Sequence, residues 1–329
     1  MSRPTIVDIA RAADVSPTTV SHAFSGRRYV EPQTRERILT LAAQLGYHAN
    51  PRARRLRTGG ASTIALASSM PFAVAAGPSK LGFLMEIAAS AAMTALARNL
   101  ALCLVPPLQT NSDLGAIEVD GAIVVEPLED DPVIAFFQAR GIPIVSIGRA
   151  PGRPDIPFVD MQSRATAFVM LDHLWRPGGR IGLITGAQRR NSYLETEAAS
   201  DEFAGERGFA PLSVRIDETG GEDAAHTTAL DLLRSHPDID AVCVPVDAFA
   251  TGVLSAAQEY GRPVPARLRV ATRYDGMRAR LATPSLTAVD LHLDQVAEAA
   301  VALLIAAMEG REPSGTTMSP PRLILRNSS

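Results

Sequence analysis

Residues 5–24 read TIVDIARAADVSPTTVSHAF, and this stretch decides the architecture of the first part of the chain. Its first half repeats apolar residues at helical spacing, which is typical of one buried helix face. The members of this apolar stripe are Ile6, Ile9, Ala10 and Ala13. The pattern then breaks and restarts at Ser16-Pro17, where a hydroxyl can cap a new helix and proline suits its first position. The stretch therefore predicts two short helices joined by a tight turn.

Two further helical segments complete this region. The second helix, from Pro17 to about residue 24, turns Val20 and Phe24 inward and leaves its polar side chains exposed. Those polar side chains are Thr18, Thr19, Ser21 and His22. A third helix opens at Pro32, ends at Gly46 and buries four apolar residues. The buried residues are Ile38, Leu41, Ala42 and Leu45. Three short helices of this kind predict an all-α helix-turn-helix headpiece over residues 1–49.

The charge of the chain is unevenly distributed. The formal net charge is −3, yet residues 1–60 carry ten arginines and four acidic residues, a net +6, which leaves −9 for the remainder. A basic head on an acidic body indicates a polyanionic partner for the head.

A short basic segment follows the headpiece. Residues 50–57 read NPRARRLR, with four arginines and one large apolar residue, Leu56, and residues 58–60 read TGG. A helix of this length is not stable alone in water. We therefore expect residues 50–60 to form a hinge helix and linker that folds against a partner.

From residue 61 onward, apolar strands alternate with amphipathic helices, which is typical of doubly wound parallel α/β sheets. The predicted strands are 63–67, 102–105, 122–125, 142–147, 181–185, 241–245 and 269–271. The predicted helices are 82–99, 132–140, 164–175, 223–235, 248–260 and 296–308. Because about 270 residues exceed what one such layer usually holds, we expect two lobes with a cleft between them.

Several stretches together resemble the LacI/GalR (lactose-repressor/galactose-repressor) family of transcriptional regulators. Residues 5–24 carry the resemblance, followed in register by TRERI at 34–38, LGY at 45–47 and residues 50–57. In the core it extends over VDGAI, RIGLITG and TPSLT, which are residues 119–123, 180–186 and 283–287.

The resemblance implies a periplasmic-binding-protein-like core over residues 61–329. Its N-lobe would hold about 61–160 plus 290–319, and its C-lobe about 161–289 plus 320–329. It also implies a cytoplasmic homodimer, with a small-molecule effector bound between the lobes. A sugar or sugar derivative is one candidate for that effector.

The resemblance further implies a pseudo-palindromic double-stranded operator. The recognition helices would enter successive major grooves, and the hinge segments would fold in the minor groove, where Leu56 wedges a base step. The alternative for Leu56 is an interdomain packing contact. For His22 two roles stay open, reading a guanine or thymine or touching only phosphate. The predicted DNA-binding residues are Thr5, Ser16, Pro17, Thr18, Thr19, Ser21, His22, Ser25, Tyr29, Thr34, Asn50, Ala53, Arg54, Leu56 and Arg57.

The same resemblance places an effector site in the cleft. The predicted effector-binding residues are Phe72, Arg149, Asp160, Arg190, Asn191, Ser192, Thr196 and Asp275. For Arg149 and Asp160 the alternative is an interlobe salt bridge. Thr196 stands where the family usually carries an arginine that forks onto ligand oxygens, which weakens the expectation of a sugar.

Two other function classes fit the sequence less well. An enzyme is disfavoured, because the six histidines show no paired metal spacing and there is no phosphate-loop lysine or nucleophile elbow. We accordingly expect no cofactor and no metal. A periplasmic-type binding protein without a DNA role would share the core fold. The basic headpiece and the lack of a signal peptide or membrane span argue against it.

Overall fold

The computed structural model describes residues 6–25, 28–45, 62–75, 82–105 and 118–329. The chain divides into two compact units, Met1–Ala61 and Ser62–Ser329, which are described separately. The predicted hinge residues 50–57 lie outside the described residues.

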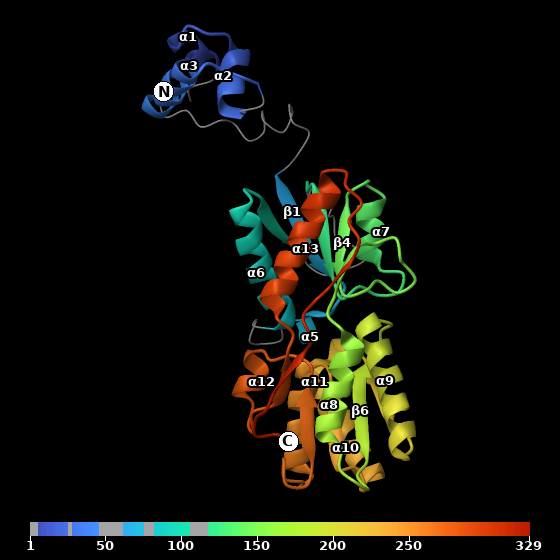
Figure 1. Ribbon diagram of the computed structural model, residues 1–329. Coiled ribbons are helices and arrows are strands. Elements are labelled where there is room, and N and C mark those ends of the chain that lie inside the picture. Colours follow the sequence, from blue (N-terminus) through green and yellow to red (C-terminus); the bar gives the residue numbers. More distant parts are fainter. Residues whose placement is uncertain (1–5, 26–27, 46–61, 76–81, 106–117) are drawn as a thin grey trace. The chain divides into compact units, whose positions relative to one another are not determined.

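The first unit is a bundle of α1 (Ile6–Ala12), α2 (Pro17–Ser25) and α3 (Pro32–Gln44) (Figure 1). Its small core is fully closed to solvent around Ile9, Val20 and Ile38. The Thr19 amide donates to Ser16 Oγ at 3.0 Å, so Ser16 caps α2 as the sequence predicted.

Two expectations for this bundle are wrong. Leu45 was expected to be buried, but it lies just beyond the last residue of α3 and its side chain is 46% exposed. Ser21 was expected to be exposed, but it is buried beside Val20. Ser21 directly follows the fully buried Val20, about 100° further around the helix, so it lies at the edge of the buried face, whereas the exposed Thr18 lies on the far side.

The N-lobe of the second unit is a six-stranded sheet with strand order β11-β5-β4-β3-β1-β2, parallel in every pair. Its strands are β1 (Thr63–Ser68), β2 (Ala101–Val105), β3 (Gly121–Val125), β4 (Ile144–Ile147), β5 (Phe158–Asp160) and β11 (Thr316–Thr317). Its helices are α5 (Phe72–Ala75), α6 (Phe83–Ala97), α7 (Pro132–Gln138) and α13 (Leu293–Met308). The strands β1, β3 and β4 are almost entirely buried, which explains why their sequences read as continuous apolar runs.

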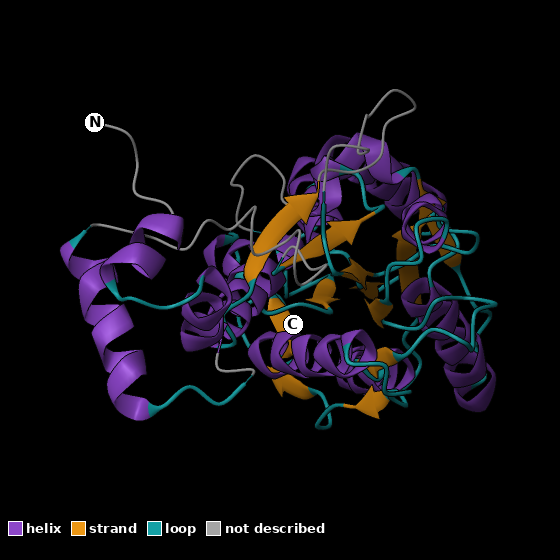
Figure 2. Ribbon diagram, turned by 90° about the horizontal axis from the view of Figure 1, so that it is seen from above, coloured by secondary structure: helices purple, strands orange, loops and turns teal. Residues whose placement is uncertain are grey.

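The C-lobe repeats this plan with strand order β12-β10-β9-β8-β6-β7, in which only β12 is antiparallel to its neighbour. Its strands are β6 (Ile181–Gly186), β7 (Ser213–Ile216), β8 (Ala241–Val244), β9 (Arg269–Thr272), β10 (Thr287–Asp290) and β12 (Arg322–Ile324). Its helices are α8 (Ser163–Leu174), α9 (Asn191–Arg207), the short η2 (Glu218–Gly220), α10 (Gly221–Ser235), α11 (Asp247–Glu259) and α12 (Met277–Leu281). Helices lie on both sides of the strands when the core is seen from above (Figure 2).

The predicted two-lobed, doubly wound architecture is confirmed, and each of the seven predicted strands is present to within two residues at either end. The sequence pattern did not predict the other strands, which are β5, β7, β10, β11 and β12. The edge strand β7 alternates exposed and less exposed residues over only four positions, and β11 and β12 are still shorter. Such short edge strands carry little apolar signal.

The chain passes between the lobes through matching turns at the ends of β5 and β10. Asp160 Oδ1 accepts a hydrogen bond of 2.8 Å from the Gln162 amide, and Asp290 Oδ1 accepts one of 2.9 Å from the His292 amide. Gln162 and His292 both adopt left-handed backbone conformations, with φ of 54° and 52°. Each aspartate thus fixes a sharp turn that starts the next helix, α8 or α13. None of the helices that the structure describes has the length and apolar composition needed to span a bilayer.

Candidate functional site

The headpiece presents the start of α2 as a polar surface. Ser16, Pro17 and Thr18 are exposed, and Thr19 and His22 are partly exposed. Tyr29, in the loop before α3, is 86% exposed. These residues can be reached by a duplex, and short polar side chains at a helix start suit contacts to base edges and phosphates.

Other predicted DNA-binding residues are less available to a duplex or lie outside the described residues. The Thr34 amide and hydroxyl both donate to the Glu31 carboxylate, at 3.0 and 2.8 Å, and these bonds cap α3 and lower the pKa of Glu31. The Ser21 hydroxyl is buried, so a phosphate could reach it only if the side chain moved. The positions outside the description are Thr5, the Ser25 side chain, Asn50, Ala53, Arg54, Leu56 and Arg57.

The core contains a pocket between its two lobes, with an empty volume of about 370 Å3 that includes part of its opening. Its polar walls follow the carboxyl ends of three parallel strands. Glu126 comes directly after β3, Arg273 directly after β9, and Asp247 three residues after β8. Ligands of open α/β sheets bind at this edge, so the fold itself favours the pocket as a binding site.

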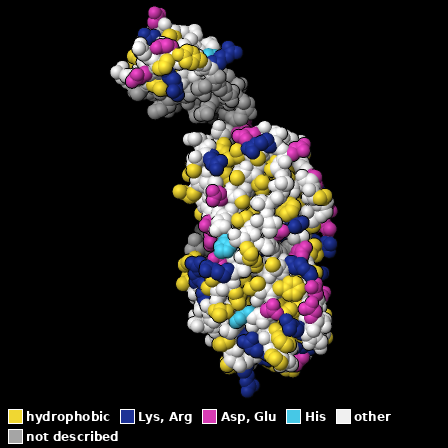
Figure 3. All heavy atoms as spheres, in the orientation of Figure 1, with side chains coloured by type: hydrophobic (Ala, Val, Ile, Leu, Met, Phe, Trp, Pro, Cys, Tyr) yellow, Lys and Arg dark blue, Asp and Glu magenta, His cyan; other side chains and the backbone are white. Residues whose placement is uncertain are grey.

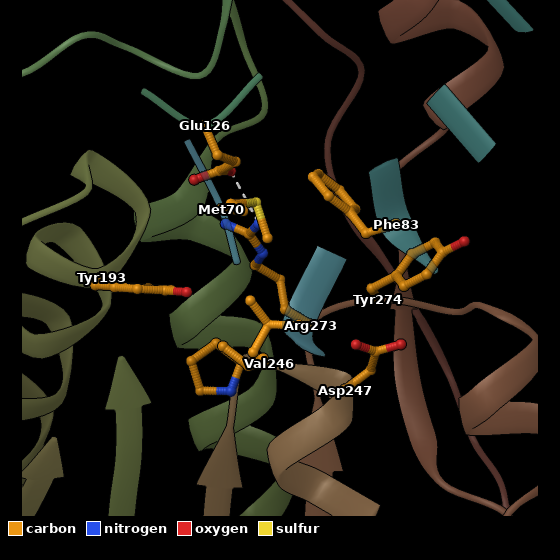
Figure 4. A pocket seen from close by; sticks show the side chains of 10 residues that line it. Met70, Phe83, Glu126, Tyr193, Val246, Asp247, Arg273 and Tyr274 are labelled. Carbon is orange, nitrogen blue, oxygen red and sulfur yellow. Dashed lines mark hydrogen bonds and ion pairs between the residues drawn. The ribbon is translucent and has the colours of Figure 1, made fainter. Parts of the chain in front are cut away.

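A buried ion pair crosses the pocket from one lobe to the other. Arg273 Nη2 donates to Glu126 Oε1 at 2.9 Å, and the side chains are 8% and 3% exposed. Ser192 donates to the other carboxylate oxygen of Glu126. Figure 4 shows the Arg273 side chain reaching into the pocket toward Glu126, with Tyr193 on one side and Phe83 and Tyr274 on the other. The N-lobe carboxylate is therefore held by two C-lobe side chains.

Aromatic side chains form part of the pocket wall. Phe83 and Tyr274 meet edge to face with their centroids 5.5 Å apart, and the Arg273 guanidinium lies 5.5 Å from the Phe83 ring centre. The Tyr274 hydroxyl donates to Glu86 of α6, and burial together with this bond raises the pKa of Tyr274. Burial and the nearby Glu218 carboxylate raise the pKa of Tyr193 as well. Both tyrosines are accordingly neutral hydrogen-bonding groups at physiological pH.

Arg190 lies behind the pocket and is fully buried, at 1% exposed. Its Nε and Nη2 donate to the two oxygens of Glu218 at 3.1 and 3.0 Å, and its Nη1 donates to Ser69 Oγ at 3.1 Å and to the Glu126 carbonyl. Burial lowers the pKa of Arg190, but the Glu218 bonds outweigh it and the pKa is raised. The guanidinium is charged, and the protein's own acceptors hold it.

The pocket lining includes none of the eight predicted effector-binding residues. Arg149 and Asp160 pair with each other at 2.9 Å within the N-lobe, rather than bridging the lobes. Asp275 is held by Arg280 at 3.1 Å and by Arg326. Thr196 donates to the Ser192 carbonyl of its own helix, Asn191 is the first residue of α9, and Phe72 is 56% exposed on α5. That these eight residues contact an effector therefore stays a prediction.

The lining residues that the sequence analysis missed are neighbours of the predicted ones or follow a strand. Tyr193 adjoins Ser192 and Tyr274 adjoins Asp275. A charged residue placed directly after a buried parallel strand, as Glu126 and Arg273 are, was the signal that could have found them.

Comparisons with known proteins agree with both units. Residues 5–50 match the family described as bacterial regulatory proteins, lacI family, and residues 171–329 match the periplasmic binding protein-like domain. The chain is 29% identical to the HTH-type transcriptional regulator IpsA of Corynebacterium glutamicum over 87% of this chain and 86% of that protein. It is 27% identical to the HTH-type transcriptional regulator CelR of Thermobifida fusca over 98% and 96%.

Solved structures share the fold. A lac repressor dimer bound to operator and the anti-inducer ONPF superposes with a TM-score of 0.79 at 21% identity, covering 99% of each chain. A complex of the transcriptional regulator CelR with cellobiose superposes with a TM-score of 0.69 at 23% identity, covering 99% of this chain and 100% of the other. The headpiece match, the core match and the regulators that align along most of their length agree with one another. The headpiece, residues 5–50, is that of the lacI family of bacterial regulatory proteins, and the chain as a whole is similar to transcriptional regulators along most of its length.

Proposed function

We propose that the protein is a sequence-specific transcriptional repressor that binds operator DNA through residues 1–57 and is controlled by a small molecule in the pocket between its lobes. The observation that carries this proposal is the combination in one chain of a helix-turn-helix headpiece, with α2 capped at Ser16, and a two-lobed core with a polar interlobe pocket. Such a protein acts on the nucleoid in the cytoplasm.

The relatives support both halves of this proposal. The relatives named above are transcriptional regulators, and the chain also matches a ribose operon repressor of Halalkalibacterium halodurans at 26% identity. The CelR and lac repressor structures contain cellobiose and ONPF, respectively. A binding protein without a DNA role is not favoured, because residues 5–50 match the regulatory family.

We infer that the effector acts by changing the relation between the lobes. A ligand shifts an equilibrium only as far as its affinities for the two states differ, so operator and effector must influence each other reciprocally. The Glu126–Arg273 pair and the Ser192–Glu126 bond both cross between the lobes at the pocket, where a ligand could strengthen or weaken them.

The hinge residues give the sharpest test of the DNA role. In a gel shift with DNA from the promoter of the protein's own gene, L56A should bind more weakly than wild type because the minor-groove wedge is removed. Replacing Arg54 and Arg57 by Gln should flatten the salt dependence of binding, by about 0.9 log units for each phosphate that is no longer neutralised. Arg234→Gln, at an exposed arginine of α10, is the matched control and should keep the wild-type slope. Equal affinity of the wild-type protein for promoter and random duplex would contradict the proposal.

We infer that the repressor is a homodimer, and exposed apolar residues of the N-lobe support this. Met93 and Leu96 of α6 are 70% and 62% exposed, and Leu104 of the edge strand β2 is 42% exposed. Apolar side chains reach the surface of the core among charged ones (Figure 3). Exposed apolar groups that cluster on neighbouring elements are typical of protein interfaces.

The double variant M93D/L96D should therefore be monomeric, because it places two charges where apolar surface would be buried. Light scattering after gel filtration would measure the mass. The same measurement on Arg234→Glu should give the wild-type value. A dimer that persists in M93D/L96D would place the subunit contact elsewhere.

A further inference from the structure

Two buried polar groups in the pocket have hydrogen-bonding capacity that the described residues do not use. The Arg273 side chain is 8% exposed, and its Nε and Nη1 have no hydrogen-bond partner in the described part of the chain. Asp247 is 4% exposed, and its Oδ2 is likewise without a hydrogen bond from any described residue. Leaving such groups unpaired in a buried site is costly, so their presence in a pocket indicates a ligand that pairs with them.

The charges of the pocket indicate the sign of the charge on that ligand. Glu126 and Asp247 each bring one negative charge to the lining, and Arg273 brings one positive charge. Because Arg273 pairs with Glu126 at 2.9 Å, the lining holds no second arginine for Asp247, whose ion-pair partner is Arg278, outside the lining.

Arg278 does not cancel this charge fully. Its Nε lies 3.5 Å from Asp247 Oδ2 without forming a hydrogen bond, and its Nη1 pairs with Glu222 at 3.2 Å. Arg278 and Glu222 together add no net charge. These five side chains together carry one more carboxylate than guanidinium group.

The walls suit a positively charged group too. The Phe83 and Tyr274 rings line the pocket, and Asp247 lies on the same side as Tyr274 (Figure 4). Aromatic faces attract cations, and a carboxylate with a free oxygen offers a charge-assisted hydrogen bond.

We propose that the ligand of this pocket is a small hydroxylated amine, whose ammonium group donates to Asp247 Oδ2 and whose oxygens accept from Arg273 Nε and Nη1. This inference rests on the proposed function, because it names the class of effector for the same pocket. An acid would satisfy Arg273 but would bring a second anion beside Asp247 and Glu126. A neutral polyol could pair with both groups but would leave the excess negative charge buried.

Three sugars that share one ring and differ in charge test this assignment. D-Glucosamine, D-glucose and D-glucuronate would be titrated into the full-length protein by calorimetry at a pH of about 6.5, where an amine of ordinary pKa is protonated. We expect D-glucosamine to bind at least about tenfold more tightly than D-glucose, because a charge-assisted hydrogen bond replaces a neutral one. D-Glucuronate should bind more weakly than D-glucose.

Asp247→Asn keeps the size of the side chain and removes its charge. In this variant the preference for D-glucosamine over D-glucose should fall to within about twofold, since only the charge-assisted part of the bond is lost. Asp231→Asn is the matched control, since Asp231 is an exposed aspartate of α10 that is not part of the pocket lining, and it should keep the preference.

Tighter binding of D-glucuronate, failure of D-glucosamine to bind, or a preference that survives in Asp247→Asn would each overturn the assignment. If Asp247→Asn does not fold, the order in which the wild-type protein binds the three sugars still tests the assignment. Calorimetry involves no DNA, so these outcomes are separate from the gel shift, and a protein that binds its promoter but not D-glucosamine would lose only the ligand class.

Discussion

Arg190→Met should lower the free energy of unfolding of the core by about 3–5 kcal/mol, the usual cost of leaving one member of a buried ion pair without its partner. Arg190 and Glu218 are each 1% exposed, and the pair is held by two hydrogen bonds of 3.1 and 3.0 Å. Methionine removes both of these donors and the bonds to Ser69 and the Glu126 carbonyl. Urea unfolding followed by the fluorescence of Trp175, the single tryptophan of the chain, would measure the change.

Arg189→Met is the matched control for this prediction. Arg189 adjoins Arg190 and also pairs with a glutamate, Glu129, but these two side chains are 59% and 42% exposed. Exposed ion pairs contribute at most about 1 kcal/mol. A double variant, R190M/E218L, should recover much of the lost stability, because it removes the unpaired carboxylate. Equal losses in Arg190→Met and Arg189→Met would show that the buried pair contributes little.

Ile38→Ala should weaken operator binding while the core stays folded. Seven buried apolar residues form the core of the described part of the headpiece, and Ile38 is the large side chain that α3 brings to them. Shortening it costs about 2–5 kcal/mol in a packed core. A domain of about 50 residues is only marginally stable. We therefore expect most headpieces to be unfolded, with operator affinity reduced at least about tenfold.

The neighbouring residue gives the control. Leu39, the next residue of α3, is 39% exposed, so Leu39→Ala should leave operator affinity within about twofold of wild type. Because Trp175 lies in the core, its unfolding transition should be the same in both variants. Wild-type operator affinity in Ile38→Ala would mean that the packing of the three helices does not support DNA binding.

Local signals in the sequence were enough to predict the headpiece helices and the two-lobed α/β core. The Ser16-Pro17 restart, Pro32 at the start of α3 and the apolar runs of β1, β3 and β8 each act within a few residues. Helix caps and side-chain periodicity are properties of neighbouring residues, so they can be read without the fold. Ser21 was misplaced because it is polar yet lies at the edge of the buried face of α2.

The effector site depended on contacts that the sequence does not display. Arg190 and Asp275 carry the charges expected of ligand-binding residues, but Glu218 holds the first, and Arg280 and Arg326 hold the second. Whether a charged side chain is free for a ligand depends on which distant residue packs beside it.

The sequence by itself determined that a basic helical head precedes a doubly wound core, because caps, periodicity and charge are local. Only the tertiary structure decided that Glu126, Asp247 and Arg273 meet in one pocket, because they follow three different strands and come from two lobes. The unused hydrogen-bonding atoms and the net charge of the pocket arise only where these three side chains come together. No single stretch of the sequence shows them.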